Sequence, residues 1–250
     1  MKPGHTRFFV GYKKHTLRLW ISGFEPFVLL APLVTWAAPA SVPESYLLKP
    51  SLRYCIQRLD WRPDIVVGDM GYIHQPTKRE LRTQWNVAVV TKLKADMKAH
   101  CAYAEEQPLR CPQGEALMWL GYDEEERLHW FGPPTEAPLC NSCWERSGCP
   151  RQFQVPADTH ETFFGMIPLN TGLAHRLVRK VRSWIEASQS FEKNQLGLSM
   201  MFLNSLRFCW ATCLLADSVA LLRTLAILRD PPTKLLLQEL FPRQMPLPLE

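Results

Sequence analysis

Two acidic residues of the sequence stand in patterns that are typical of a reactive site. Asp69 closes a short β-branched run, residues 64–69, and a Met-Gly-Tyr turn follows it. An aspartate at the carboxyl end of a sheet strand faces the crevice in which open α/β sheets bind ligands. Glu186 follows Arg182 by four residues and precedes Lys193 by seven, which aligns all three along one face of a helix. Taken singly, the two patterns also fit a strand-to-turn aspartate and a solvated helix face.

Cysteines supply a second set of candidate ligands. Cys140 and Cys143 form a Cys-x2-Cys pair, Cys149 lies six residues further on, and Cys111 begins an upstream Cys-Pro-Gln-Gly segment. Four thiolates bind Zn²⁺ tetrahedrally in structural sites, so we interpret these four residues as candidate zinc ligands, with Cys101 as a substitute. The alternative is a set of reduced thiols in a loop.

The composition is that of a globular chain rather than a nucleic-acid tail. Of the 250 residues, 46% are hydrophobic, which is enough to bury a core, and the net charge is +5. That charge is compatible with a phosphate-bearing partner but far weaker than the charge of a dedicated basic tail. The first ten residues do not resemble a secretory signal. A cytosolic chain keeps its eight cysteines reduced, so their clustering favours metal over disulfides.

Two apolar stretches, residues 27–40 and 200–228, raise the question of a membrane. Prolines interrupt the first stretch, and the second contains Arg207, Asp217 and Arg223. Each charge at the centre of a membrane helix costs about 2.5–3.5 kcal/mol. We therefore expect a buried helix of a soluble protein, with a membrane anchor as the alternative.

Periodicity predicts alternating strands and helices through the first hundred residues. The expected strands are residues 8–22, 25–36, 64–69 and 87–90, with prolines confining the second strand to an edge or a bulge. The expected helices are residues 43–59 and 77–85, the latter with Thr77 as N-cap and Glu80 completing a capping box. This alternation predicts an α/β sheet with helices on its faces.

The character of the sequence changes after residue 98. Residues 99–158 combine Cys, Trp, Pro and acidic clusters with little periodicity, and we interpret them as an insertion whose aromatic residues pack it. Residues 159–229 are expected to be largely helical, with Cys209 and Cys213 in the core. Residues 230–250 are expected to form a proline-rich tail.

The combination of motifs resembles the insertion-sequence DDE transposases. In that family a hydrophobic strand ends in Asp-x-Gly-Tyr, as residues 66–72 do, and a later helix carries Arg-x3-Glu-x6-Lys, as residues 182–193 do. The family usually has a Tyr three residues before that Arg, where this chain has Arg179. Two shorter segments, residues 11–15 and 38–44, are similar as well, and the group often carries a comparable cysteine-containing insertion.

This resemblance, over about residues 8–228, implies an RNase H-like mixed sheet flanked by helices. The catalytic domain would combine residues 1–98 and 159–229. It also implies Mg²⁺- or Mn²⁺-dependent cleavage and strand transfer of DNA, with Asp69 and Glu186 as metal ligands. Arg182, Lys193 and Tyr72 would contact the DNA of the transposon ends and target. The resemblance further implies a cytoplasmic, nucleoid-associated bacterial protein without a membrane partner, and a homodimer on DNA as its assembly.

One element of the family pattern is missing. The first family aspartate belongs on the strand before Gly11, yet residues 1–24 contain no Asp or Glu. Lys13, Lys14 and His15 near that position would repel a metal ion. We therefore expect the carboxy-terminal part of a transposase, a truncated copy that is inactive alone. The alternative is a non-catalytic DNA-binding or zinc-stabilised interaction module that retains the fold.

Overall fold

The chain divides into two structural units, one of which is built from both ends of the sequence. In this computed structural model the first unit comprises residues 1–61 and 183–250, and the second comprises residues 62–182. The residues that the structure describes are 11–24, 27–100, 102–105, 107–134, 140, 143, 149–198 and 205–229. The expected tail, residues 230–250, and the substitute ligand Cys101 lie outside them.

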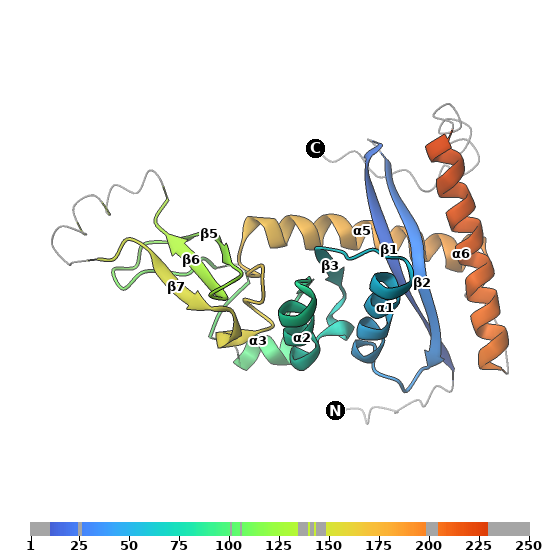
Figure 1. Ribbon diagram of the computed structural model, residues 1–250, viewed down its shortest axis with the longest axis horizontal. Helices are drawn as coiled ribbons and strands as arrows, with labels where there is room; N and C mark the ends of the chain where they lie inside the picture. The colour runs from blue at the N-terminus through green and yellow to red at the C-terminus, as the bar shows by residue number, and fades with distance from the viewer. Residues whose placement is uncertain are drawn as a thin grey trace, which may run out of the picture. The chain divides into compact units, whose positions relative to one another are not determined.

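The first unit is centred on an antiparallel hairpin. Strand β1, Tyr12–Phe24, pairs with β2, Phe27–Pro39, as two of the expected strands. The register shifts once in mid-hairpin, where Leu17 lies opposite Val34 but Arg18 lies opposite Pro32. This irregularity accommodates the proline, which has no N–H to give to a ladder, and so confirms the expected bulge. Helices α1, Ser45–Arg58, and α6, Leu206–Arg229, both contact β2 (Figure 1).

The helical region near the carboxyl end forms two long helices. Helix α5, Gly172–Gln195, starts in the second unit and ends in the first, and α6 follows it. Cys209 and Cys213 are buried on α6, which confirms their predicted place in the core. Within the described residues, α6 is the one helix that is long and apolar enough to cross a membrane by length and composition.

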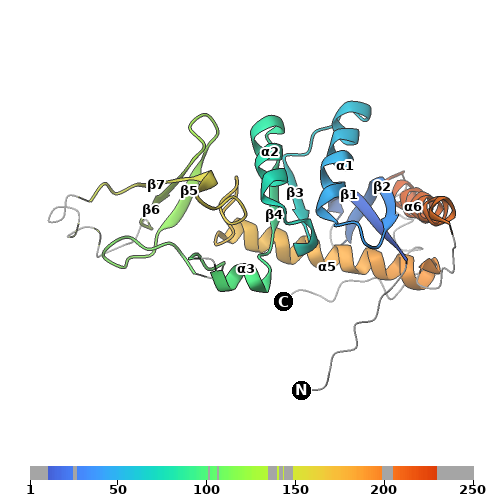
Figure 2. The same cartoon turned by 90° about the horizontal axis from the view of Figure 1, so that it is seen from below.

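The second unit contains a parallel strand pair. Strand β3, Ile65–Gly68, lies parallel to β4, Ala88–Thr91, and helix α2, Gln75–Trp85, connects them and packs against β4 (Figure 2). The prediction of Thr77 as N-cap was wrong. Helix α2 starts two residues earlier with a proline in its first turn, and the side chain of His74 accepts the hydrogen bond from the Thr77 amide. Helix α3, Ala95–His100, follows β4.

The expected insertion contains regular structure that its sequence did not reveal. Strands β5, Met118–Asp123, β6, Leu128–Gly132, and β7, Phe153–Pro156, form an antiparallel sheet in that order. Of its aromatic residues, Phe131 joins Phe163 and Phe164 in the core of the unit, and Trp119 and Phe153 pack against that core. Trp144 lies outside the described residues. A short 3-10 helix, Ala157–His160, leads toward α5.

The described part of the chain is thus of the mixed α/β class. It contains three small sheets, namely the β1–β2 hairpin, the parallel β3–β4 pair and the three-stranded antiparallel sheet. Parallel pairing of β3 and β4 through α2 is the feature that positions the candidate site.

Candidate functional site

Asp69 occupies the position that its sequence pattern predicted. It directly follows β3 and is the N-cap of a short 3-10 helix, Met70–Tyr72, whose first amide donates a 2.7 Å hydrogen bond to Asp69 Oδ1. The side chain is exposed, and Tyr72 closes the same turn. One carboxylate oxygen of Asp69 is therefore held by the backbone, which orients the group toward solvent.

The carboxyl end of the neighbouring strand adds a basic residue. Gly68 pairs with Thr91 at the end of β4, so Asp69 and the exposed Lys92 each follow directly on one of two adjacent parallel strands. Ligands of open α/β sheets bind outside the carboxyl ends of the strands. This edge can bind a cation through Asp69 or a phosphate through Lys92.

The other predicted site residues lie on α5. Arg182, Glu186 and Lys193 are all exposed on this helix, with Arg182 one turn before Glu186 and Lys193 about two turns after it. Asp69 belongs to the second unit and Glu186 to the first, so the meeting of their carboxylates stays a prediction.

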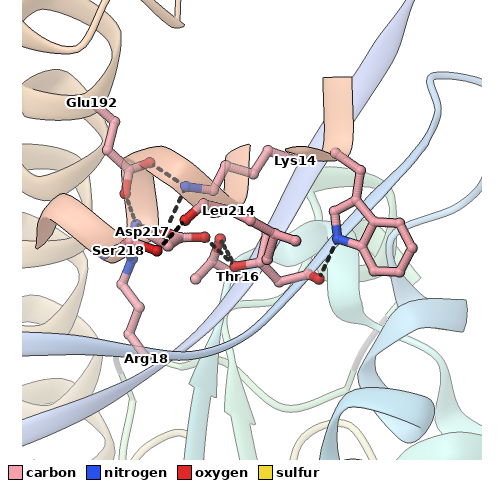
Figure 3. A network of polar contacts seen from close by, with 9 residues as sticks. Lys14, Thr16, Arg18, Glu192, Leu214, Asp217 and Ser218 are labelled. Atoms are coloured by element: carbon pink, nitrogen blue, oxygen red, sulfur yellow. Dashed lines mark hydrogen bonds and ion pairs between the residues drawn. The ribbon is translucent and has the colours of Figure 1, made fainter. Parts of the chain in front are cut away.

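A buried ion cluster in the first unit was missed by the sequence analysis. Lys14 Nζ on β1 donates to Glu192 Oε2 of α5 at 2.8 Å and to Asp217 Oδ1 of α6 at 2.7 Å (Figure 3). Arg18, four residues along β1, also pairs with Glu192, and its guanidinium lies 3.7 Å from Asp217. The hydroxyl of Thr35 on β2 donates to Asp217 as well. We call Lys14, Arg18, Thr35, Glu192 and Asp217 the ion cluster.

Electrostatics favour the charged form of the ion cluster. Burial alone would raise the pKa of Glu192, but the charge of Arg18 and the hydrogen bond and charge of Lys14 outweigh it and lower that pKa. Two carboxylates face two cations, so Lys14 carries a compensated charge. This pairing removes Lys14 from the group of residues that we expected to repel a metal ion.

A second buried polar network lies behind the β3–β4 edge. The guanidinium of Arg82 donates to both carboxylate oxygens of Glu161, at 3.0 and 2.7 Å, and to the Tyr122 hydroxyl at 3.2 Å. Burial alone would lower the pKa of Arg82, but its hydrogen bonds to Glu161 and Tyr122 outweigh this and raise it. The network ties α2 to β5 and to the segment before α5, so the strand pair that bears Asp69 rests on a fixed scaffold.

Lys78 of α2 is buried beside this network. Its Nζ lies 3.2 Å from the Thr162 carbonyl and 3.5 Å from the Thr91 hydroxyl at the end of β4. Burial lowers the pKa of Lys78 to about 8, against the opposing influence of Glu161. The charged and the neutral forms of the Lys78 amine are therefore close in free energy near neutral pH.

The four candidate zinc ligands are partly exposed thiols. Cys111 begins a tight turn in which the Gly114 amide donates to its carbonyl at 2.8 Å, and Gly114 has a φ of +86°. Desolvation raises the pKa of Cys140, and Glu115, Cys111, Cys143 and Cys149 raise it further. Among the described residues, however, no group of three or more His, Cys, Asp or Glu side chains is arranged to hold a metal ion.

No protein-family model, curated protein or solved structure matches this chain. The functional interpretation therefore depends on the residues themselves.

Proposed function

We propose that this chain is part of the RNase H-like catalytic domain of a DDE transposase, which cleaves DNA and transfers the freed strand. The observation that carries the proposal is the exposed carboxylate of Asp69, which the turn after β3 holds at the carboxyl end of a parallel strand. The exposed Arg182, Glu186 and Lys193 of α5 are its second support.

In this proposal each residue has a defined task. Asp69 and Glu186 supply oxygen ligands for Mg²⁺, or for Mn²⁺, and the bound ions would activate the attacking oxygen and stabilise the leaving 3′ oxygen. Arg182 and Lys193 neutralise phosphates of the transposon ends and target. Tyr72, at the end of the turn that begins with Asp69, contacts the same DNA.

The proposed fold rests on the combination of strands. An antiparallel hairpin, a parallel strand pair joined by a helix, and a long helix bearing the glutamate are the kinds of element that an RNase H-like mixed sheet flanked by helices would contain, and here the hairpin and the parallel pair form separate sheets. The three-stranded sheet formed by β5, β6 and β7 is the insertion before the glutamate helix. In the same proposal the protein is cytoplasmic and associated with the nucleoid, and it acts on DNA as a homodimer.

The chain alone should bind metal weakly and leave DNA uncut. Two Mg²⁺ ions bring four positive charges, whereas Asp69 and Glu186 offer two negative ones, and residues 1–24 contribute no acidic side chain. Fusing a strand that carries an aspartate upstream should restore nicking. Cleavage by the unextended chain that is abolished by Asp69→Ala would show that the first carboxylate has been misplaced.

Metal binding gives the direct test. We expect Mn²⁺ titration, followed by paramagnetic resonance, to detect a weak site that Asp69→Asn and Glu186→Gln each abolish. Asp64→Asn is the matched control, because Asp64 is an exposed aspartate immediately before the same strand. Equal Mn²⁺ binding by all four proteins would refute the metal assignment.

DNA binding tests the basic residues separately. Each phosphate contact changes the slope of log K against log salt by about 0.9, so Arg182→Ala and Lys193→Ala should each reduce the slope by roughly one. Arg53→Ala, at an exposed position on α1, is the control and should leave the slope unchanged. If the three variants behave alike, the DNA face lies elsewhere.

The second candidate function is a zinc-stabilised interaction module without catalysis. The tight turn at Cys111 and the effect of the neighbouring cysteines on the pKa of Cys140 favour it, because four thiols are a donor set that suits Zn²⁺. Elemental analysis should find one zinc per chain, lost in Cys143→Ala and kept in Cys209→Ala, where the thiol is buried on α6. Zinc-free protein of unchanged fold would exclude this module.

A further inference from the structure

Helix α6 presents its apolar residues outward and its polar residues inward. Asp217 is 7% exposed within the ion cluster, and the Arg223 guanidinium lies over the Phe191 ring at 5.1 Å from its centroid. In contrast, Phe208 and Leu215 are both 68% exposed and Leu222 is 66% exposed. A surface helix of a soluble protein has the opposite arrangement. An apolar face of this kind indicates a contact surface.

The outward residues repeat with a period of seven. Phe208, Leu215 and Leu222 are seven apart, and each is followed after three residues by one of Ala211, Ser218 and Leu225. This is the spacing of a coiled-coil seam. We call these six residues the α6 seam. Between Arg207 and Arg229, every exposed residue of α6 except Ser218 is apolar.

The exposed area is of the size that a protein partner needs. Eight large apolar residues of α6 are exposed, namely Phe208, Trp210, Leu214, Leu215, Val219, Leu221, Leu222 and Leu225. Their exposed fractions add up to about four whole side chains, on the order of 600–1,000 Å². A stable interface buries about 800 Å² on each partner.

We call these eight exposed apolar residues, together with the α6 seam, the α6 face. A bilayer fits the α6 face less well than a protein does. A helix lying on a membrane carries a cationic face toward water, whereas the inner face of α6 is bound to the β1–β2 hairpin through Asp217 and Trp210. A helix spanning the membrane would take the ion cluster into the lipid. The seam carries no charged residue, so it suits a protein partner whose contact surface is also uncharged.

We propose that the α6 face is an interface between two copies of this chain, in which the two α6 helices pair antiparallel about a two-fold axis. In an antiparallel pair, the positions of Phe208, Leu215 and Leu222 on one helix lie opposite the positions of Ala211, Ser218 and Leu225 on the other. The seam is therefore complementary to itself. Ala211 then lies opposite the partner's Leu222, Ser218 opposite the partner's Leu215, and Phe208 opposite the partner's Leu225. A parallel pair would instead set small residues against small ones and leave gaps.

Sedimentation velocity tests this register. It measures the oligomeric state of the full chain at high salt and without DNA. The unaltered chain should be a dimer at micromolar concentration. Leu222→Glu should weaken the dimer by roughly thirtyfold or more, since it buries an unpaired charge within the seam. Tyr46→Glu, which alters a 61% exposed residue of α1 in the same unit, is the control and should leave the dimer intact.

A charge-pair variant distinguishes the register from other pairings. Ala211→Lys combined with Leu222→Glu should restore the dimer, because each introduced ammonium group faces the introduced carboxylate of the other copy. The two positions are eleven residues apart and cannot pair within one helix. A monomeric unaltered chain, a dimer that Leu222→Glu leaves intact, or a double variant that stays monomeric would overturn the proposal. Sedimentation with phosphatidylglycerol vesicles in place of dimer formation would assign the face to a membrane and overturn it as well. The result is independent of transposase activity.

Discussion

Replacing Glu192 with Gln is the most informative perturbation of the first unit. The substitution keeps the size of the side chain and removes its charge, so Lys14 and Arg18 must share the single carboxylate of Asp217. Breaking a buried ion pair on one side costs about 3–5 kcal/mol, because the uncompensated charge remains in the interior. Folded domains are stable by about 5–15 kcal/mol, so the first unit should lose a large part of its stability.

Hydrogen exchange followed by mass spectrometry measures this loss within the first unit alone. Amides of β1 should exchange roughly 10²- to 10⁴-fold faster in Glu192→Gln at pH 7, and amides of β5 and β6 in the second unit should not change. Gln189→Ala, at an exposed position of the same helix, is the control and should change stability by no more than about 0.5 kcal/mol.

The pH dependence of Glu192 provides an independent check with a defined sign. Its pKa in the folded protein is lowered, so its contribution is complete above the ordinary glutamate pKa and is lost as the pH falls through the folded value. The unaltered first unit should therefore lose stability in acid, and Glu192→Gln should lose less. A loss below about 1 kcal/mol in Glu192→Gln at pH 7, or equal acid sensitivity of both proteins, would refute the role of the ion cluster.

The second unit should respond to pH and to core truncation in three further ways. Burial lowers the pKa of Lys78 to about 8, so the unit should gain about 3 kcal/mol between pH 8 and 10.5, and hydrogen exchange of Lys78→Met should show no such gain. Burial lowers the pKa of His129 to about 4 despite the hydrogen bond to Gly165. The free energy of unfolding should therefore fall by about 3 kcal/mol as the pH falls from 6.5 to 4, and denaturant titrations of His129→Gln should show no such dependence. Phe164→Ala should cost about 3–5 kcal/mol in the same titrations because the side chain is fully buried, and a cost below 1 kcal/mol would mean that the core around it is loose.

Four strands and two helices of the first hundred residues could be predicted because their signals are local, whereas the short helix α3 was not predicted. Alternating and continuous apolar runs predicted β1 to β4, and three- and four-residue spacing predicted α1. Helix α2 was predicted from a capping box that begins at Thr77, whereas its N-cap is His74. The sheet of β5, β6 and β7 was missed because its strands have no regular alternation, and His129 is buried in it as a neutral ring bonded to Trp119 and Gly165. A buried histidine reads as a polar position in the sequence.

The site was predictable only where adjacent residues define it. Asp69 follows from a strand and a turn in one short segment, and the structure agrees. The ion cluster joins residues separated by 178 and 203 positions, so no window of the sequence contains it. In the sequence Lys14 was expected only to repel a metal ion, Arg18 was assigned no role, and Asp217 served only as an argument against a membrane helix. Pairing of charges across such separations depends on tertiary structure, which spacing does not encode.

That long separation has a consequence for how the protein is made. During synthesis β1 and β2 emerge first, but the carboxylate of Glu192 that balances Lys14 is added 178 residues later. At about 5–20 residues per second the ribosome needs roughly 10–35 s to reach it. The second unit, a continuous segment of residues 62–182, can fold during this interval, whereas the hairpin waits with two cations on the surface that it will later bury. The ion cluster can therefore form only after Glu192 and Asp217 have been made, so the first unit depends on residues that are synthesised after the whole of the second unit.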